Sequence, residues 1–124
     1  MTILSASTLM NDPVVNPQGE DLGKIEDFVL DTKNGRVEYA VLSFGGLFGI
    51  GDKLFAVPLE AFRLDTTRER LTLDVTKERL ENAPGFDKDH WPKTADRSFT
   101  ERAYSHWGVD YRRERDRVME PVLN

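Results

Sequence analysis

The chain has 124 residues, no cysteine and only two histidines. Without thiols, it cannot form disulfides, thiolate metal sites or dithiol redox centres. Its apolar runs are five residues or shorter, whereas a membrane-spanning helix needs about 20. Residues 1–13 have neither a basic start nor a sustained apolar stretch, so no signal peptide is predicted. We therefore expect a soluble, cytoplasmic protein with one main domain.

Positive charge is also scarce, and the formal net charge is −5. Residues 1–95 carry all of it, with 11 Lys and Arg against 16 Asp and Glu, while residues 96–124 have 6 of each. Binding to a nucleic-acid backbone requires clustered positive charge. The composition thus makes nucleic acid an unlikely partner for the main domain, although a local basic patch is not excluded.

Short β-rich segments separated by turn residues dominate the first three quarters of the chain. This pattern predicts strands over residues 14–15, 22–31, 36–44, 54–57, 62–65 and 70–75. Short strands at such spacing favour a mainly β fold, a small, highly curved antiparallel β-barrel. A short helix is predicted over 77–82 with Thr76 as its N-cap. We place the β domain at residues 1–93 and a charged, partly helical C-terminal extension at 94–124.

Two groups of residues are predicted to form structural turns. Asn34 and Gly35 lie between two β-rich runs and predict a hairpin with a type I′ turn. The glycines of the second group predict a sharp corner before the next strand; they are Gly45, Gly46, Gly49 and Gly51. This cluster is not a phosphate loop, because a strand rather than a helix follows it.

The predicted strand 36–44 is apolar on both faces in its second half. Tyr39 and Val41 lie on one face, and Ala40 and Leu42 on the other. Such a strand is either central in the core or covered on its outer face by something else. The following loop adds further apolar side chains. We hypothesise that a homodimer interface is formed by Ala40, Leu42, Phe44, Leu47, Phe48 and Ile50.

No residue pattern predicts catalysis, and we expect no catalytic, cofactor-binding or metal-ligating residues. His90 and His106 each lie beside a tryptophan and lack the companions that a metal site needs. A Ser-His-Asp arrangement is not excluded by counting residues, but no nucleophile elbow supports one. Asp27 is expected on the same strand face as Ile25, accepting hydrogen bonds from loop amides.

In the C-terminal extension, the spacing of Phe99, Ala103 and Trp107 predicts a short helix over residues 98–107 with these three side chains on one face. Beyond it, acidic and basic side chains alternate in a charge-dense stretch. A solvated surface is the simpler interpretation, and contact with a partner or phosphate is the alternative for Arg112, Arg113, Arg115 and Arg117.

Taken together, these motifs resemble the PRC-barrel family, which includes the cytoplasmic domain of the photosynthetic reaction-centre H subunit and the C-terminal domain of the ribosome maturation factor RimM. The likeness spans roughly residues 5–92 and is carried by residues 14–15, 19, 22–31, 35–37, 39–46, 49–51 and 55–58. Residues 85–88 (Gly-Phe-Asp-Lys) and Trp91-Pro92 resemble the stand-alone bacterial members. The resemblance implies a small β-barrel that acts through contacts and has no catalytic residues. The chain shows neither a membrane segment nor an RNA-binding domain ahead of the barrel, so we expect neither a reaction-centre nor a RimM role.

We therefore expect a non-enzymatic protein-interaction module that self-associates as a homodimer, with an unidentified protein as a further candidate partner. The alternative is a ribosome- or RNA-associated accessory protein that acts through the arginine-rich tail. A small-molecule or enzyme role in the barrel mouth is a third possibility, but the sequence shows no set of convergent polar residues for it.

Overall fold

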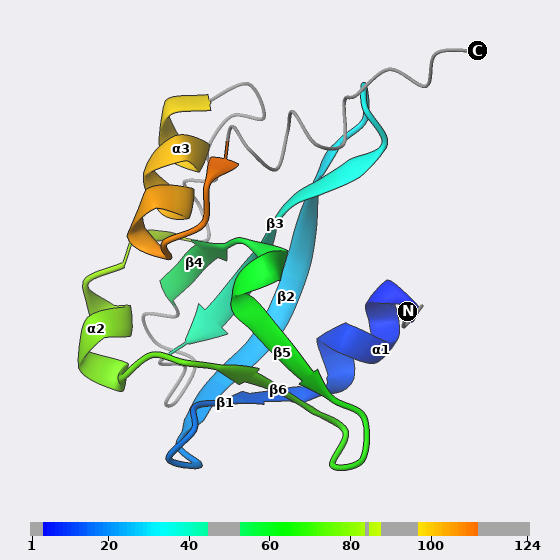
Figure 1. Cartoon of the computed structure of the whole chain (residues 1–124), viewed down its shortest axis with the longest axis vertical. Coiled ribbons are helices and arrows are strands. Elements are labelled where there is room, and N and C mark those ends of the chain that lie inside the picture. Colours follow the sequence, from blue (N-terminus) through cyan, green and yellow to red (C-terminus); the bar gives the residue numbers. More distant parts are fainter. Residues whose placement is uncertain (1–3, 45–52, 84, 88–96, 112–124) are drawn as a thin grey trace.

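The structure is a computed structural model and describes residues 4–44, 53–83, 85–87 and 97–111. Figure 1 shows a strongly curved sheet with the N-terminal helix on the right and two further α-helices on the left. In chain order, the elements are α1 (Ala6–Asn11), β1 (Pro13–Val15), β2 (Asp21–Asp31), β3 (Arg36–Phe44), β4 (Lys53–Val57), the 3-10 helix η2 (Leu59–Ala61), β5 (Phe62–Asp65), β6 (Arg70–Leu73), α2 (Lys77–Glu81), β7 (Gly85–Asp87) and α3 (Arg97–His106).

The strands form one seven-stranded sheet in the order β5-β6-β1-β2-β3-β4-β7. All neighbouring strands are antiparallel except β1 and β6, which pair in parallel through Val14–Leu71 and Val15–Thr72. Among the strands that the structure describes, no pairing joins β5 to β7. The predicted mainly β class is confirmed, while closure into a hydrogen-bonded barrel is not seen.

All six predicted strands and the helix after Thr76 are present, and Thr76 Oγ1 accepts the Arg79 N–H at 3.1 Å as an N-cap. The elements that the sequence analysis missed are α1, β7 and η2. In α1, Ser5 Oγ accepts the Thr8 N–H at 3.2 Å. Ser5 is therefore the N-cap of α1, and a serine at this position could have indicated the start of the helix in the sequence.

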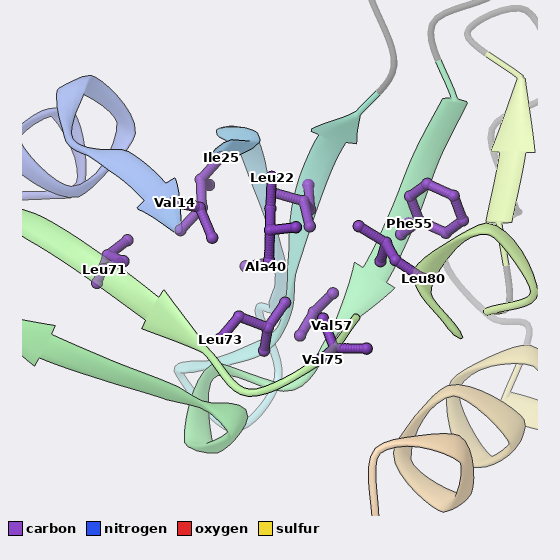
Figure 2. Close-up of a cluster of buried hydrophobic side chains, with 11 residues drawn as sticks. Val14, Leu22, Ile25, Ala40, Phe55, Val57, Leu71, Leu73, Val75 and Leu80 are labelled. Atoms are coloured by element: carbon purple, nitrogen blue, oxygen red, sulfur yellow. The ribbon is translucent and has the colours of Figure 1, made fainter. Parts of the chain in front are cut away.

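The main core lies inside the curve of the sheet (Figure 2). Side chains from β6 face those from β2, β3 and β4, and Leu80 of α2 points toward Phe55. We call this group the inner cluster; it consists of Val14, Leu22, Ile25, Ala40, Leu42, Phe55, Val57, Leu71, Leu73, Val75 and Leu80. Every member is at least 95% buried, as expected where alternate residues of neighbouring strands face one core.

One polar side chain, Asn16, ties the turn after β1 to the chain that follows β6. Asn16 is 2% exposed. Its Oδ1 accepts the Glu20 N–H at 2.8 Å, and its Nδ2 donates to Glu20 Oε1 at 2.8 Å and to the Val75 carbonyl at 3.2 Å. Because a buried amide needs such partners, Asn16 fixes where these two segments meet.

The β2–β3 hairpin was predicted correctly, but its turn type was not. Asp31 pairs with Arg36, so four residues form the turn, and the Gly35 N–H donates to the Asp31 carbonyl at 2.8 Å. Gly35 has φ +68°, whereas Asn34 has no positive φ, which rules out a type I′ turn. The Asp31 carboxylate accepts the N–H groups of Lys33 and Asn34, and this side-chain cap stabilises the longer turn.

Gly23 of β2 lies close against the backbone of β3 at Ser43. Its φ is +110°, and a Cβ on it would stand 1.9 Å from the carbonyl oxygen of Ser43. That distance is far inside van der Waals contact. Only glycine therefore allows the two strands to pair here without a shift of the backbone.

Replacing Gly23 with alanine is expected to lower the free energy of unfolding by about 3 kcal/mol or more, because overpacking and backbone strain act together. Gly35→Ala is the matched control, since it also has a positive φ but has no atom within 4 Å of the added Cβ. The control is expected to cost about 1 kcal/mol. Urea unfolding measures both, and equal losses would contradict the steric account.

Candidate interaction surfaces

Strand β3 presents apolar side chains on both faces, and the two faces enter different clusters. Ala40 and Leu42 belong to the inner cluster, whereas Tyr39 and Val41 lie on the opposite face. On that face they join a second group, here called the outer cluster, made of Tyr39, Val41, Leu54, Ala56, Phe99 and Ala103. The predicted division of the strand into two faces is confirmed.

Helix α3 covers the outer face of β3 and β4. Phe99 packs edge-on against Tyr39 and Phe86, with ring centroids 6.2 and 5.8 Å away. The Tyr104 hydroxyl donates to the Glu38 carbonyl of β3, and Trp107 Nε1 donates to the Ala56 carbonyl of β4 at 3.2 Å. Residues 99–107, which follow the predicted boundary at residue 93, therefore pack against β3 and β4.

The predicted interface residues are separated by the fold. Ala40 and Leu42 are fully buried, so they have no surface to offer a second copy, which corrects the hypothesis for these two residues. Phe44 is partly buried at the end of β3 and packs edge-on against Phe55. The remaining candidates lie outside the described residues; they are Leu47, Phe48 and Ile50, together with the predicted corner glycines Gly45, Gly46, Gly49 and Gly51.

Asp27 does not have the predicted position. The pairing of β2 with β3 is irregular between Ile25 and Asp27: Ile25 pairs with Leu42, and Asp27 pairs with Val41. Because Leu42 and Val41 are consecutive and point to opposite faces, Ile25 and Asp27 also lie on opposite faces. Asp27 is exposed and its Oδ1 accepts the adjacent Phe28 N–H at 2.8 Å. The Asp27 carboxylate thus accepts a hydrogen bond from its own strand and not from a loop. The bulge is the reason, because it interrupts the alternation of side chains between the two faces of β2.

A shallow hollow of about 350 Å³ lies between the β2–β3 hairpin and α3. Leu30 borders it and is 58% exposed, the highest exposure among the large hydrophobic residues described. Asp31, Glu38 and Tyr111 also line it, and the Tyr111 hydroxyl donates to Glu38 Oε2 at 3.3 Å. The hollow therefore combines one apolar side chain with two carboxylates.

A second hollow of about 310 Å³ follows the exposed side of α3 and shares Arg97 and Tyr111 with the first. The Arg97 guanidinium lies 5.7 Å from the centroid of the Tyr111 ring, within the range of a cation–π contact. Tyr111 also packs edge-on against Tyr104, 5.0 Å away. Tyr111 is thus the side chain around which the two hollows meet. We call them together the hairpin groove.

The sequence analysis did not single out Leu30, Tyr104 or Tyr111. Tyr104 follows Phe99 and Ala103 at helical spacing, which was a usable signal. The exposure of Leu30 follows from the reach of the hairpin beyond the rest of the sheet (Figure 1), a property of tertiary structure. The tail arginines Arg112, Arg113, Arg115 and Arg117 lie outside the described residues, as does His90.

His106, at the end of α3, has a pKa that its surroundings shift. Its Nε2 is buried and makes no hydrogen bond, and its ring packs edge-on against Trp107. Burial lowers the pKa of His106 below its ordinary value of 6.5, and the positive charge of Arg79 on α2 lowers it further. The neutral imidazole is therefore the form that the fold favours.

Within the described residues, no group of three or more His, Asp or Glu side chains is placed to hold a metal ion. In the same part of the chain, no helix has the length and apolar character needed to cross a membrane.

These observations define a mainly β domain in which one curved sheet encloses the inner cluster and a C-terminal helix covers the outer face. Residues 1–80 match the family model of the PRC-barrel domain, so the chain belongs to the PRC-barrel family. A search of curated proteins finds no match. The resemblance is confirmed, and α3 lies beyond the matched residues.

The lowered pKa of His106 predicts a specific loss of stability in mild acid. Protons bind more tightly to the unfolded chain than to the folded one, so the contribution is fully present above pH 6.5 and is lost as the pH falls below it. His106→Gln is expected to reduce the fall in unfolding free energy between about pH 7.5 and about pH 5.5. His90→Gln, which removes the other histidine, is the control. If His90→Gln flattens the profile and His106→Gln does not, the assignment is wrong.

Proposed function

We propose that the chain is a non-catalytic protein-interaction module that forms a homodimer through the end of the sheet where β3 leads into residues 45–52. Membership of the PRC-barrel family supports an interaction module in general terms. The proposed dimer surface comprises Phe44, Leu47, Phe48 and Ile50, without the buried Ala40 and Leu42.

The observation that carries this proposal is the position of Phe44. Its ring packs against the inner cluster and against Phe55, yet it is only partly buried. The apolar core therefore reaches the surface at this end of β3. In the sequence, Leu47, Phe48 and Ile50 follow within six residues. Exposed apolar side chains that gather in one place are typical of a protein–protein contact, and we propose that these residues supply such a contact.

The polar groups of the hairpin groove support a role without catalysis. The Tyr104 and Tyr111 hydroxyls both donate to Glu38, one to its carbonyl and one to its carboxylate. The Asp31 carboxylate accepts three hydrogen bonds that hold its own turn. These groups maintain the positions of α3 and the hairpin, whereas a catalytic group needs to act on a substrate.

Phe48→Asp is expected to convert the dimer into a folded monomer, because a carboxylate in an apolar contact loses hydration without gaining a partner. Sedimentation at micromolar concentration measures the mass, and circular dichroism checks the fold. The matched control is Leu30→Asp, which places the same charge on an exposed leucine near the other end of β3.

The control is expected to keep the mass of the unaltered chain. A monomeric unaltered chain, or a Phe48→Asp chain of unchanged mass, would refute the proposed dimer surface. A monomer produced by Leu30→Asp alone would move self-association to the hairpin end.

A further inference from the structure

Among the residues that the structure describes, the lining of the hairpin groove carries more negative than positive charge. Its carboxylates are those of Asp31, Glu38, Glu101 and Asp110, and its cations are those of Lys33 and Arg97. Four negative groups against two positive ones give a formal charge of −2. The groove therefore suits a cationic occupant rather than a nucleic-acid phosphate.

The groove also presents surfaces that suit arginine. The Arg97 guanidinium lies 5.7 Å from the centroid of the Tyr111 ring, so a guanidinium reaches this ring at cation–π distance. Leu30 offers an exposed apolar surface beside the carboxylates. An arginine side chain can place its methylene groups along such a surface while its guanidinium contacts a carboxylate.

The chain itself supplies a matching segment immediately after Tyr111. Residues 112–117 read Arg-Arg-Glu-Arg-Asp-Arg, with four arginines against two acids and a formal charge of +2. Tyr111 lines both halves of the groove, so this segment begins at the groove. A binding segment joined by so short a connection has an effective concentration in the millimolar range, which an outside ligand rarely reaches.

We propose that the arginine-rich segment 112–117 binds in the hairpin groove of its own chain. The segment is then the built-in occupant of this surface, and an outside protein that uses the groove has to displace it. This groove lies at the hairpin end of β3 (Figure 1), whereas Phe44, the described residue of the proposed dimer surface, is the last residue of β3, at its other end. The two proposals therefore stand or fall separately.

Paramagnetic NMR on the full chain tests this directly. The chain has no cysteine, so Val118→Cys gives one site for a nitroxide label. We expect the oxidised label to remove the amide signals of residues 30–33, and reduction of the label to restore them. If these signals persist in the oxidised sample, the segment does not occupy the groove and the proposal is wrong.

A mixed sample separates contact within one chain from contact between chains. Labelled chains without ¹⁵N are added to ¹⁵N chains without a label, and the intramolecular proposal predicts no signal loss. The signals of residues 30–33 could instead be lost in the mixed sample as strongly as in the chain that carries both ¹⁵N and the label. That result would show binding between copies and overturn the proposal.

A charge-matched pair of variants tests the role of the arginines. Replacement of Arg112, Arg113, Arg115 and Arg117 by glutamine is expected to restore the signals of residues 30–33 despite the oxidised label. The control replaces four exposed cations elsewhere by glutamine, at Lys24, Lys53, Arg63 and Lys77, and is expected to keep the signal loss. Equal signal loss in both variants would show that arginine charge does not hold the segment. Salt at about 1 M, where the screening length is about 3 Å, is expected to act like the arginine variant.

Discussion

The architecture depends on β3, a strand with apolar side chains on both faces. Burial of apolar surface is the main favourable contribution to folding, and a strand of this kind leaves no face that water can cover without cost. The inner face is buried by the curve of the sheet, with Leu42 beside Phe55 and Ile25 in register. The outer face cannot be buried by the same curve, so a separate element has to cover it. Helix α3 does so with Phe99 and Ala103, and it directs the Tyr104 and Trp107 donors to carbonyls of β3 and β4.

This arrangement also determines which surfaces are left for contact. Once both faces of β3 are covered, its middle residues are unavailable, and the apolar groups near this strand that still reach the surface lie toward its two ends. Phe44 marks one end, and Leu30 on the paired strand marks the other. The docking of α3 also creates the hairpin groove, because the groove has α3 as one wall. A helix that lies beyond the matched family residues therefore both completes the core and forms a new surface.

The sequence was sufficient for most of the fold because strand alternation and turn residues are local signals. The sequence predicted strands β1 to β6 and the helix with Thr76 as its N-cap, and it indicated that β3 is apolar on both faces. It could not decide between a partner and an internal element as the cover for the outer face, since that depends on where α3 packs.

Local signals also failed where side chains altered the backbone pattern. The Asp31 carboxylate favours a four-residue turn over the type I′ turn expected from Asn34-Gly35, and the β2 bulge moves Asp27 to the face opposite Ile25. The hairpin groove joins residues more than 60 positions apart, such as Glu38 and Tyr111, and no local pattern predicts such a meeting.

The most direct test of this account is the stability of two glutamate variants on α3. Ala103 is fully buried against the sheet, whereas Ser105 on the same helix is exposed. If α3 is an integral cover of β3, Ala103→Glu lowers the free energy of unfolding by about 3–5 kcal/mol, the usual effect of a buried unpaired charge. Ser105→Glu then stays within about 0.5 kcal/mol of the unaltered chain. Urea unfolding followed by tryptophan fluorescence measures both. Equal stabilities for the two variants would show that the sheet does not need the helix and would contradict the account.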